Sequence, residues 1–146
     1  IGVAGYPEKH MEAASLEQDI YHLKKKVEAG ADYIVTQMFF DNQKYYDFVE
    51  KCRTSGINVP IIPGLKPITT KSQLSMIPHR FKVDFPNELV IAIAKAKDNK
   101  EVKEIGINWC IQQSKDLMKN GAPVLHYYSM GKSEVVKRIA SEVFKD

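Results

Sequence analysis

Four short apolar segments alternate with longer helical patterns along the chain, and this alternation constrains the fold more than any other feature. The four segments span residues 1–6, 33–40, 59–65 and 124–130. A short apolar run followed by a helical pattern is typical of a strand–helix unit, and successive units build a parallel sheet. The sequence therefore predicts an α/β fold. Pro60 and Pro63 interrupt the third segment, and because proline cannot donate to a sheet ladder, they weaken the prediction that this segment pairs as a strand.

Helical signals fill the intervals between these segments. Apolar residues recur every three or four positions over residues 16–27, so they form one stripe along a helix. Ser15 followed by Gln18 is a capping-box pattern at the start of this helix, and Asp41 can cap the next helix, which stops near Gly56. Further helices are expected from Thr70 with Gln73 as a second capping box, from Pro86 to about 97, from about 100 to 120, and over 135–144.

Four strand–helix units correspond to half of a (β/α)8 TIM barrel, which takes about 250 residues when complete. A small doubly wound sheet is the alternative architecture. Residues capable of chemistry follow every predicted strand: Tyr6, His10, Gln37, Lys66, Gln73, Tyr128 and Lys132. In a barrel all of these positions face one mouth, where active sites form, which favours the half-barrel interpretation for a single domain over residues 1–146. A half-barrel leaves sheet edges and an interior face uncovered, so we expect a missing N-terminal half or self-association into a homo-oligomer.

Composition excludes several classes of function. Lysine and arginine total 21 against 18 acidic residues, and a net charge of +3 is too small to indicate a nucleic-acid or polybasic membrane surface. No apolar run is long enough to span a bilayer and no leader pattern is present, so a cytoplasmic protein is expected. Cys52 and Cys110 lack metal-ligand spacing and are expected to be reduced, buried and structural. The glycine-rich phosphate loops, the HExxH pattern and the GxSxG elbow are all absent, which argues against a metal or nucleophilic-serine enzyme.

Two stretches near the N-terminus could bind a ligand. The loop from Tyr6 to Ala13 places an aromatic ring, a proline turn and His10 between the first strand and its helix, although a polar surface turn is an equally simple reading. On the following helix, Asp19, His22 and Lys26 form a second stripe about a quarter-turn from the apolar one. They could line the rim of a site, or they could be part of a solvated face.

Two glutamines and the last strand provide further candidates. Gln37 lies in an otherwise apolar run, where an amide must find hydrogen-bond partners or address a ligand. Gln73 either completes its capping box or contacts a substrate. Tyr128 alternates onto one face of the last strand, and Lys132 just beyond it suits an anionic group or solvent.

Taken together, these segments resemble the methylenetetrahydrofolate reductase family. The resemblance rests on Ala4-Gly5-Tyr6-Pro7-Glu8-Lys9-His10, on Thr36-Gln37-Met38-Phe39-Phe40-Asp41, on Ile61-Ile62-Pro63-Gly64-Leu65-Lys66-Pro67 and on His126-Tyr127-Tyr128-Ser129-Met130. It covers essentially the whole chain in order. It implies the C-terminal half of a flavin-dependent TIM barrel, in which FAD is reduced by NAD(P)H and passes a hydride to 5,10-methylenetetrahydrofolate, giving 5-methyltetrahydrofolate.

The resemblance also implies roles for individual residues. It assigns FAD contacts to Tyr6, His10, Ala13, Asp19, His22, Lys25 and Lys26, and folate contacts to Gln37, Gln73, Tyr128 and Lys132. Lys25 points almost directly away from the apolar stripe, so geometry argues against its contact. Family members can carry Arg where this chain has Lys132, and an aromatic where it has Ile77.

The family's acidic residues lie in the other half of the barrel, so this segment is expected to hold no catalytic acid or base. We therefore expect the 146-residue chain alone to bind FAD weakly or not at all and to show no reductase turnover. The alternative from a different class is a non-catalytic half-barrel that self-associates as a binding module.

Overall fold

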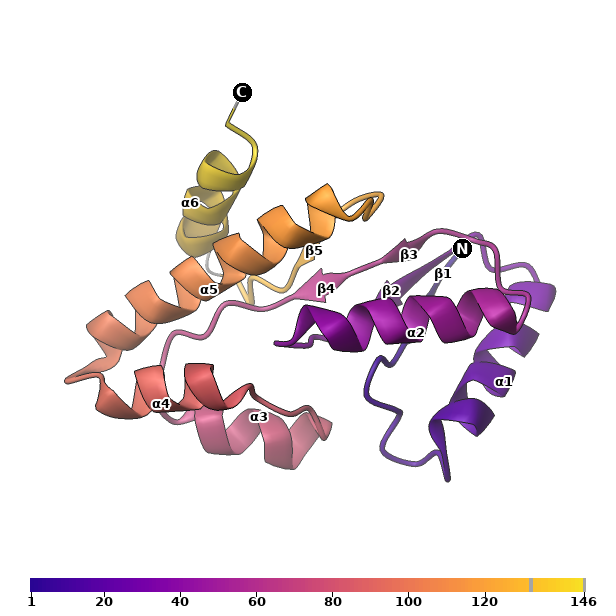
Figure 1. The fold of residues 1–146 in the computed structure, drawn as a ribbon, viewed down its shortest axis with the longest axis horizontal. Helices are drawn as coiled ribbons and strands as arrows, with labels where there is room; N and C mark the ends of the chain where they lie inside the picture. The colour runs from indigo at the N-terminus through magenta and orange to yellow at the C-terminus, as the bar shows by residue number, and fades with distance from the viewer. Residues whose placement is uncertain (132, 146) are drawn as a thin grey trace.

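The computed structural model describes residues 1–131 and 133–145 of the 146-residue chain. The helices are α1 (Leu16–Glu28), α2 (Asn42–Thr54), α3 (Gln73–Phe81), α4 (Asn87–Lys95), α5 (Asn99–Lys119) and α6 (Ser133–Val143). The strands are β1 (Gly2–Gly5), β2 (Tyr33–Thr36), β3 (Ile61–Ile62), β4 (Gly64–Leu65) and β5 (His126–Tyr127). Strands and helices alternate through most of the chain (Figure 1), which confirms the predicted α/β class.

The strands are parallel and follow one another in chain order. β1 pairs with β2 and β2 with β3, while β4 pairs with β5. Only Pro63 separates β3 from β4, so one extended segment touches β2 on one side and β5 on the other. Pro63 has no N–H to donate, but its carbonyl accepts from His126 N at 3.0 Å, so the segment joins the two small sheets. The prolines thus divide the third strand rather than prevent its pairing.

The helix starts follow from their capping residues. Ser15 Oγ accepts from Gln18 N at 3.2 Å, and Asp41 Oδ1 accepts from Gln43 N at 2.9 Å, as the sequence predicts. The capping residue expected at Thr70 is wrong by two residues, because α3 begins at Gln73 and its N-cap residue is Ser72.

Two differences in extent have local causes. The second strand ends at Thr36 rather than residue 40, because Met38, Phe39 and Phe40 leave the ladder and are buried in the hydrophobic core. The fourth strand is limited to His126–Tyr127. Each apolar run is therefore longer than the strand it contains, because some of its residues are buried in the core without pairing in the sheet.

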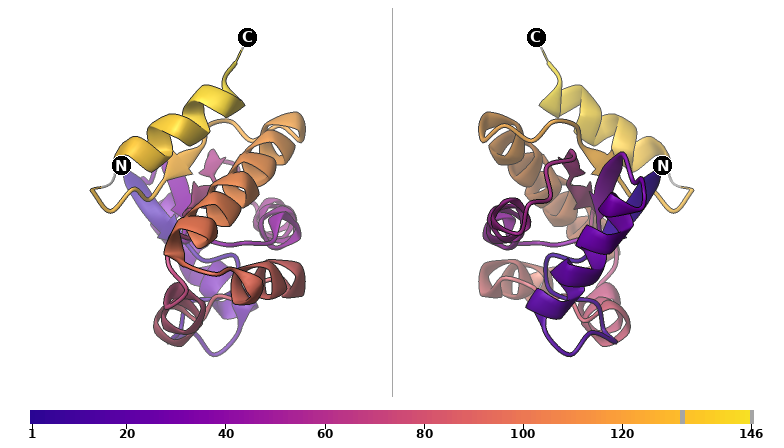
Figure 2. Two further views of the ribbon diagram at one scale, coloured as in Figure 1. Left: turned by 90° about the vertical axis from the view of Figure 1, so that its left-hand side faces the viewer. Right: turned by 90° about the vertical axis from the view of Figure 1, so that its right-hand side faces the viewer.

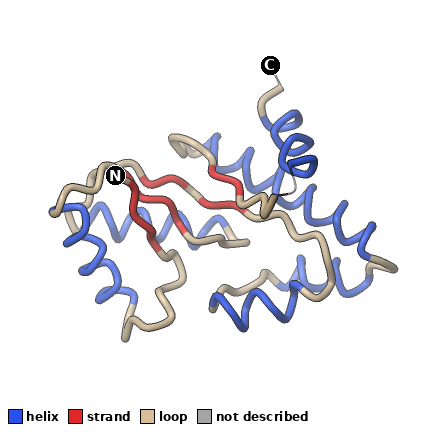
Figure 3. Tube along the Cα trace, turned by 180° about the vertical axis from the view of Figure 1, so that it is seen from behind, coloured by secondary structure: helices blue, strands red, loops and turns tan. Residues whose placement is uncertain are grey.

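The two faces of the three-stranded sheet differ. The row Val3, Ile34 and Ile61 packs into the larger core cluster with α1, α2, the C-terminal part of α5 and α6. The neighbouring row of Ala4, Val35 and Ile62 is exposed or half-buried. Seen from behind, the strands lie in front of α2 and α5, and no helix crosses them (Figure 3). Helices therefore cover one face of these strands and leave the other open.

A second core cluster lies below the strands in Figure 1. It is built from α3, α4 and the N-terminal part of α5, around Ile77, Leu89 and Val102, each of them fully buried. Figure 2 shows α1 on the opposite side of the molecule from the α3–α4 pair and α5. Among the described residues, no helix is both long and apolar enough to cross a membrane.

Candidate functional site

The carboxyl ends of three strands meet at one edge of the sheets. Gln37 N donates to Gly5 O at 2.8 Å, which joins the end of β2 to the end of β1. The Tyr128 hydroxyl donates to Thr36 O at 2.8 Å, although these residues are 92 positions apart. The segments that carry Tyr6, Gln37 and Tyr128 therefore lie side by side, as the half-barrel interpretation requires.

Thr36 holds this edge together. It is fully buried, and its Oγ1 accepts from Gly64 N at 2.9 Å while its carbonyl accepts from Tyr128. A Cβ on Gly64 would lie 2.7 Å from Tyr128 Cε2 and closer still to Thr36 O. A glycine is required here because β2 and the Tyr128 ring approach the backbone so closely.

The first ligand-sized hollow lies beside β1 and α1, and we call it the α1 hollow. It has a volume of about 310 Å³ and is lined by Tyr6, His10, Glu12, Ala13, Gln18, Asp19, His22 and Lys26. The structure thus brings together six of the seven residues assigned to FAD by resemblance. Asp19 holds the loop in place, because its Oδ2 accepts from His10 N at 2.8 Å. The rings of Tyr6 and His10 meet edge to face with centroids 4.6 Å apart.

The polar groups of the α1 hollow have defined hydrogen-bonding states. His10 Nδ1 accepts from Glu12 N at 3.2 Å, so the imidazole presents Nε2 as its donor. Burial, and then the charge of Asp19, raise the pKa of Tyr6, so its phenol stays protonated at neutral pH. Lys26 adds an exposed cation. This set of donors suits hydroxyl and phosphate groups.

Lys25 does not join this set. Its Nζ lies 3.3 Å from Glu28 Oε2 and 5.4 Å from the centroid of the Tyr21 ring. It is exposed on another side of α1 and does not line the α1 hollow. Its assignment to FAD by resemblance stays a prediction.

The second hollow lies at the ends of β4 and β5, and we call it the β5 hollow. It has a volume of about 230 Å³ and is lined by Lys66, Pro67, Thr69, Gln73, Met76, Tyr128, Ser129, Met130, Val135 and Val136. Two residues assigned to folate, Gln73 and Tyr128, therefore share one hollow. Burial, and then Tyr6, raise the pKa of Tyr128, so it acts as a hydroxyl donor.

The glutamines are partly committed to the fold. Gln73 Oε1 accepts from Thr69 N at 2.7 Å and from Thr70 N at 3.1 Å, so the expected capping box is half formed. Half-buried Gln37 accepts at Oε1 from Met38 N at 3.0 Å. Gln37 does not line the β5 hollow. It follows Thr36, whose carbonyl accepts the hydrogen bond from the Tyr128 hydroxyl. The remaining folate residue, Lys132, lies outside the described residues.

Glu8 is a buried carboxyl group that the sequence analysis did not predict, because it treated this residue as part of a polar turn. Its Oε1 accepts from Asp84 N at 3.1 Å, while its Oε2 is buried without a hydrogen-bond partner among the described residues. Burial raises the pKa of this carboxyl to about 7. Its position beside Pro7 gave no sign that the α3–α4 connection would cover it.

In the described part of the chain, no group of three or more His, Cys, Asp or Glu side chains is placed to hold a metal ion. Cys52 and Cys110 are free and buried, as predicted.

The fold and the site define a class: an α/β protein whose parallel strands gather donor-rich side chains at their carboxyl ends, where open α/β folds bind ligands. Comparison with known proteins is more specific. The family model for methylenetetrahydrofolate reductase matches residues 1–143, and the chain belongs to this family.

Curated relatives agree with this assignment. The chain is 40% identical over 140 residues to methylenetetrahydrofolate reductase (NADH) 1 of Arabidopsis thaliana, a match that covers 89% of this chain and 24% of that protein. It is 34% identical over 136 residues to 5,10-methylenetetrahydrofolate reductase of Salmonella typhimurium, covering 92% and 46%. The chain therefore spans less than half the length of these relatives.

A solved structure from Clostridium thermocellum shares the fold, with a TM-score of 0.59 at 19% identity over 97% of this chain and 51% of that one. It is described as an uncharacterized protein that binds two copies of 5-methyl-5,6,7,8-tetrahydrofolic acid.

Proposed function

We propose that this chain is the C-terminal half of a flavin-dependent TIM barrel that reduces 5,10-methylenetetrahydrofolate to 5-methyltetrahydrofolate with NAD(P)H. Family membership supports the reaction, and the convergence of Tyr6, Gln37 and Tyr128 at one sheet edge supports the placement of the site. This convergence is the observation on which the proposal depends.

The residues of the α1 hollow fit part of FAD. A dinucleotide carries ribityl and ribose hydroxyls and two phosphates, and the hollow offers a phenol, two imidazoles, an ammonium group, an amide and two carboxylates. Its volume of about 310 Å³ is too small for the entire cofactor, so the remainder has to lie along the strand ends. Hydride transfer between a nicotinamide and a folate is the chemistry that a bound flavin supplies.

The residues of this chain then bind the cofactor and the folate and orient them. Asp19 fixes the loop of residues 6–13 by accepting from His10 N, which keeps Tyr6 and His10 on the cofactor side. Lys26 offsets phosphate charge. Gln37 and the Tyr128 hydroxyl lie at the adjoining strand ends, where an amide and a phenol can hydrogen-bond a pterin ring. None of these groups has to move a proton, so the proposal assigns them binding roles.

The open face of the sheet supports completion by a further half-barrel. Ala4, Val35 and Ile62 form one row that helices do not cover, and apolar rows of this kind are buried in a closed barrel. We propose that strands of the same family domain cover this row in the complete protein. The isolated chain is then expected to lack turnover.

A chimera tests the function. The segment of the Salmonella reductase that matches this chain is replaced by residues 1–143, and the purified chimera is assayed for NADH-dependent reduction of methylenetetrahydrofolate. Turnover is expected. A folded chimera that binds flavin but reduces no folate would contradict the proposal.

A matched variant locates the folate site. Gln37→Leu keeps the approximate shape of the side chain but removes both hydrogen-bonding groups. It is expected to raise KM for the folate while NADH oxidation with an artificial quinone acceptor stays near the parent rate. An equal loss in both assays would show that Gln37 acts on the flavin or on the fold instead.

The self-associating half-barrel uses the same open face, and sedimentation distinguishes it. A 146-residue chain that forms a tight dimer and a chimera without flavin would together favour the binding module.

A further inference from the structure

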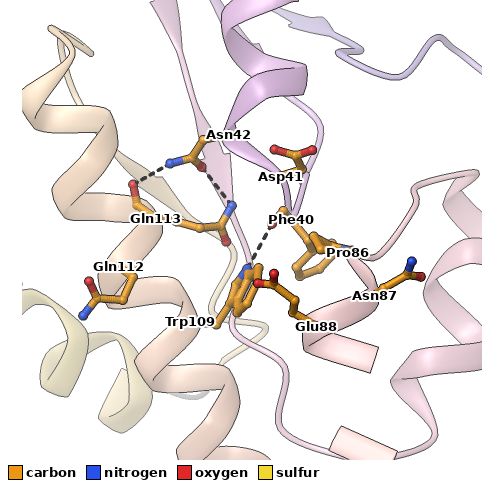
Figure 4. Close-up of a pocket in the computed structure, with 9 residues that line it drawn as sticks. All are labelled: Phe40, Asp41, Asn42, Pro86, Asn87, Glu88, Trp109, Gln112 and Gln113. Atoms are coloured by element: carbon orange, nitrogen blue, oxygen red, sulfur yellow. Dashed lines mark hydrogen bonds between the residues drawn. The ribbon is translucent and has the colours of Figure 1, made fainter. Parts of the chain in front are cut away.

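A third hollow lies between α5 and the N-terminal ends of α2 and α4 (Figure 4). At about 520 Å³ it is larger than the two hollows described above and within the range of small-molecule sites. It is lined by Phe40, Asp41, Asn42, Pro86, Asn87, Glu88, Trp109, Gln112 and Gln113. We call it the Trp109 hollow. Neither the proposed FAD contacts nor the proposed folate contacts include any of these residues.

The wall of the Trp109 hollow is held by hydrogen bonds (Figure 4). Trp109 Nε1 donates to Phe40 O at 3.0 Å, and Asn42 Nδ2 donates to Gln113 O at 3.1 Å. Gln113 Nε2 donates to Asn42 Oδ1 at 3.1 Å and to Phe39 O at 3.3 Å. These bonds join α5 to the β2–α2 connection and to the start of α2, and they fix the indole ring, so the hollow is formed before any ligand arrives.

The hydrogen bonds of this wall occupy side-chain N–H donors and leave the side-chain oxygen of Gln113 available as an acceptor. Gln113 is only 7% exposed, and both of the bonds its amide makes within the described chain use Nε2, which leaves Oε1 as an acceptor on the hollow side. The Trp109 N–H is likewise committed to Phe40. Asp41 uses Oδ1 to cap α2. Gln113 Oε1 is therefore satisfied by a ligand that brings a hydrogen-bond donor.

The charge of the hollow favours a cation. Asp41 and Glu88 contribute two carboxylates, and the lining residues include no lysine, arginine or histidine. The N-termini of α2 and α4 also face this region, and each helix end carries roughly half a positive charge. Since the two helix ends offset about one of the two negative charges, about one negative charge remains.

Part of the remaining lining is apolar. The Trp109 indole and Pro86, backed by the buried Phe40, form a surface suited to a planar body, and an indole face attracts cations. We propose that the Trp109 hollow binds a small planar organic cation of the amidinium or guanidinium class. The planar charged end lies between Asp41 and Glu88 with a donor toward Gln113 Oε1, and the apolar end lies against the indole.

Benzamidine is a suitable probe, because it joins an amidinium to a phenyl ring. Trp109 is the single tryptophan, so its fluorescence reports on this hollow alone. A saturable change is expected on titration of the 146-residue chain, with calorimetry giving the same dissociation constant. Benzamide, the neutral analogue of nearly the same shape, is expected to bind about tenfold more weakly or worse, because it cannot compensate the remaining charge.

Matched variants test the assigned carboxylates. Asp41→Asn with Glu88→Gln removes two charges while retaining a good helix cap. This double variant is expected to raise the dissociation constant for benzamidine about tenfold or more. Asp47→Asn with Glu50→Gln removes two exposed charges from α2 outside the hollow and is expected to leave the affinity within about twofold.

Three results would each overturn the inference: no saturable benzamidine binding, equal affinity for benzamide, or equal effects of the two double variants. None of them bears on the reductase proposal, since the residues concerned are different.

Discussion

Replacing Gly64 by alanine tests how closely the strand ends approach each other. The added Cβ would lie 2.7 Å from Tyr128 Cε2 and nearer to Thr36 O, where ordinary carbon contacts need about 3.5 Å. The tyrosine ring could rotate away, but the Thr36 carbonyl belongs to β2 and can move only with the strand. G64A therefore forces β2 and β4 apart.

The magnitude follows from three contributions. Overpacking costs about 1–3 kcal/mol, and weakening the bond from the Tyr128 hydroxyl to Thr36 O adds about 0.5–1.5 kcal/mol. Alanine also makes the unfolded chain less flexible than glycine does, which stabilises the folded state by about 0.4–1 kcal/mol. G64A is thus expected to lower the free energy of unfolding by about 0.5–4 kcal/mol, a large part of the roughly 5–15 kcal/mol typical of a domain.

Urea unfolding followed by circular dichroism measures this loss. With a slope of about 2 kcal/mol per molar, the midpoint should fall by about 0.25–2 M. Gly121→Ala is the control, because its added Cβ meets nothing within 4 Å and carries only the strain of a φ of +83°. G64A should be the more destabilising of the two. A G64A protein as stable as the parent would refute the packing that joins β2, β4 and Tyr128.

Three further variants or treatments follow from the same structure. Thr36→Val should cost about 1–3 kcal/mol in urea unfolding, because the buried Gly64 N–H loses its acceptor; a neutral effect would remove Thr36 from its assigned role. Burial raises the pKa of Glu8 from 4.5 to about 7, so the folded state binds this proton more tightly, and stability should fall as pH rises from about 5 to 8. Glu8→Gln should flatten that dependence, and an unchanged slope would contradict the assignment. Burial also raises the pKa of Cys52 and of Cys110 to about 12, so neither thiol should react with a disulfide dye at neutral pH until urea unfolds the chain; rapid reaction of the folded protein would count against their burial.

Local patterns predicted the elements of the fold well. Ser15 and Asp41 cap the helices that the sequence assigned to them, because capping depends on residues three or fewer positions apart. Strand ends were predicted less well. Phe39 and Phe40 extend the apolar run, but tertiary packing draws them into the core, and nothing local distinguishes burial in a core from pairing in a strand.

In the candidate site too, features that depend on local spacing could be predicted, and features that depend on distant residues could not. The stripe of Asp19, His22 and Lys26 follows from helical periodicity, and the structure places these residues around one hollow. The buried carboxyl of Glu8 could not be predicted, because residue 84, which covers it, is 76 positions away. Gln113 offered a weak signal, a polar residue on the apolar face of a long helix, but its partners lie more than 70 positions earlier.

The flavin content of paired chimeras tests the central claim most directly. Lys26 lines the α1 hollow, whereas the adjacent Lys25 lies beside Glu28 and Tyr21 on another side of the helix. In the Salmonella chimera, Lys26→Ala should markedly lower the flavin absorbance per mole of folded protein, and Lys25→Ala should leave it near the parent value. Equal flavin content in both variants, or loss confined to Lys25→Ala, would show that FAD does not bind where these strand ends converge.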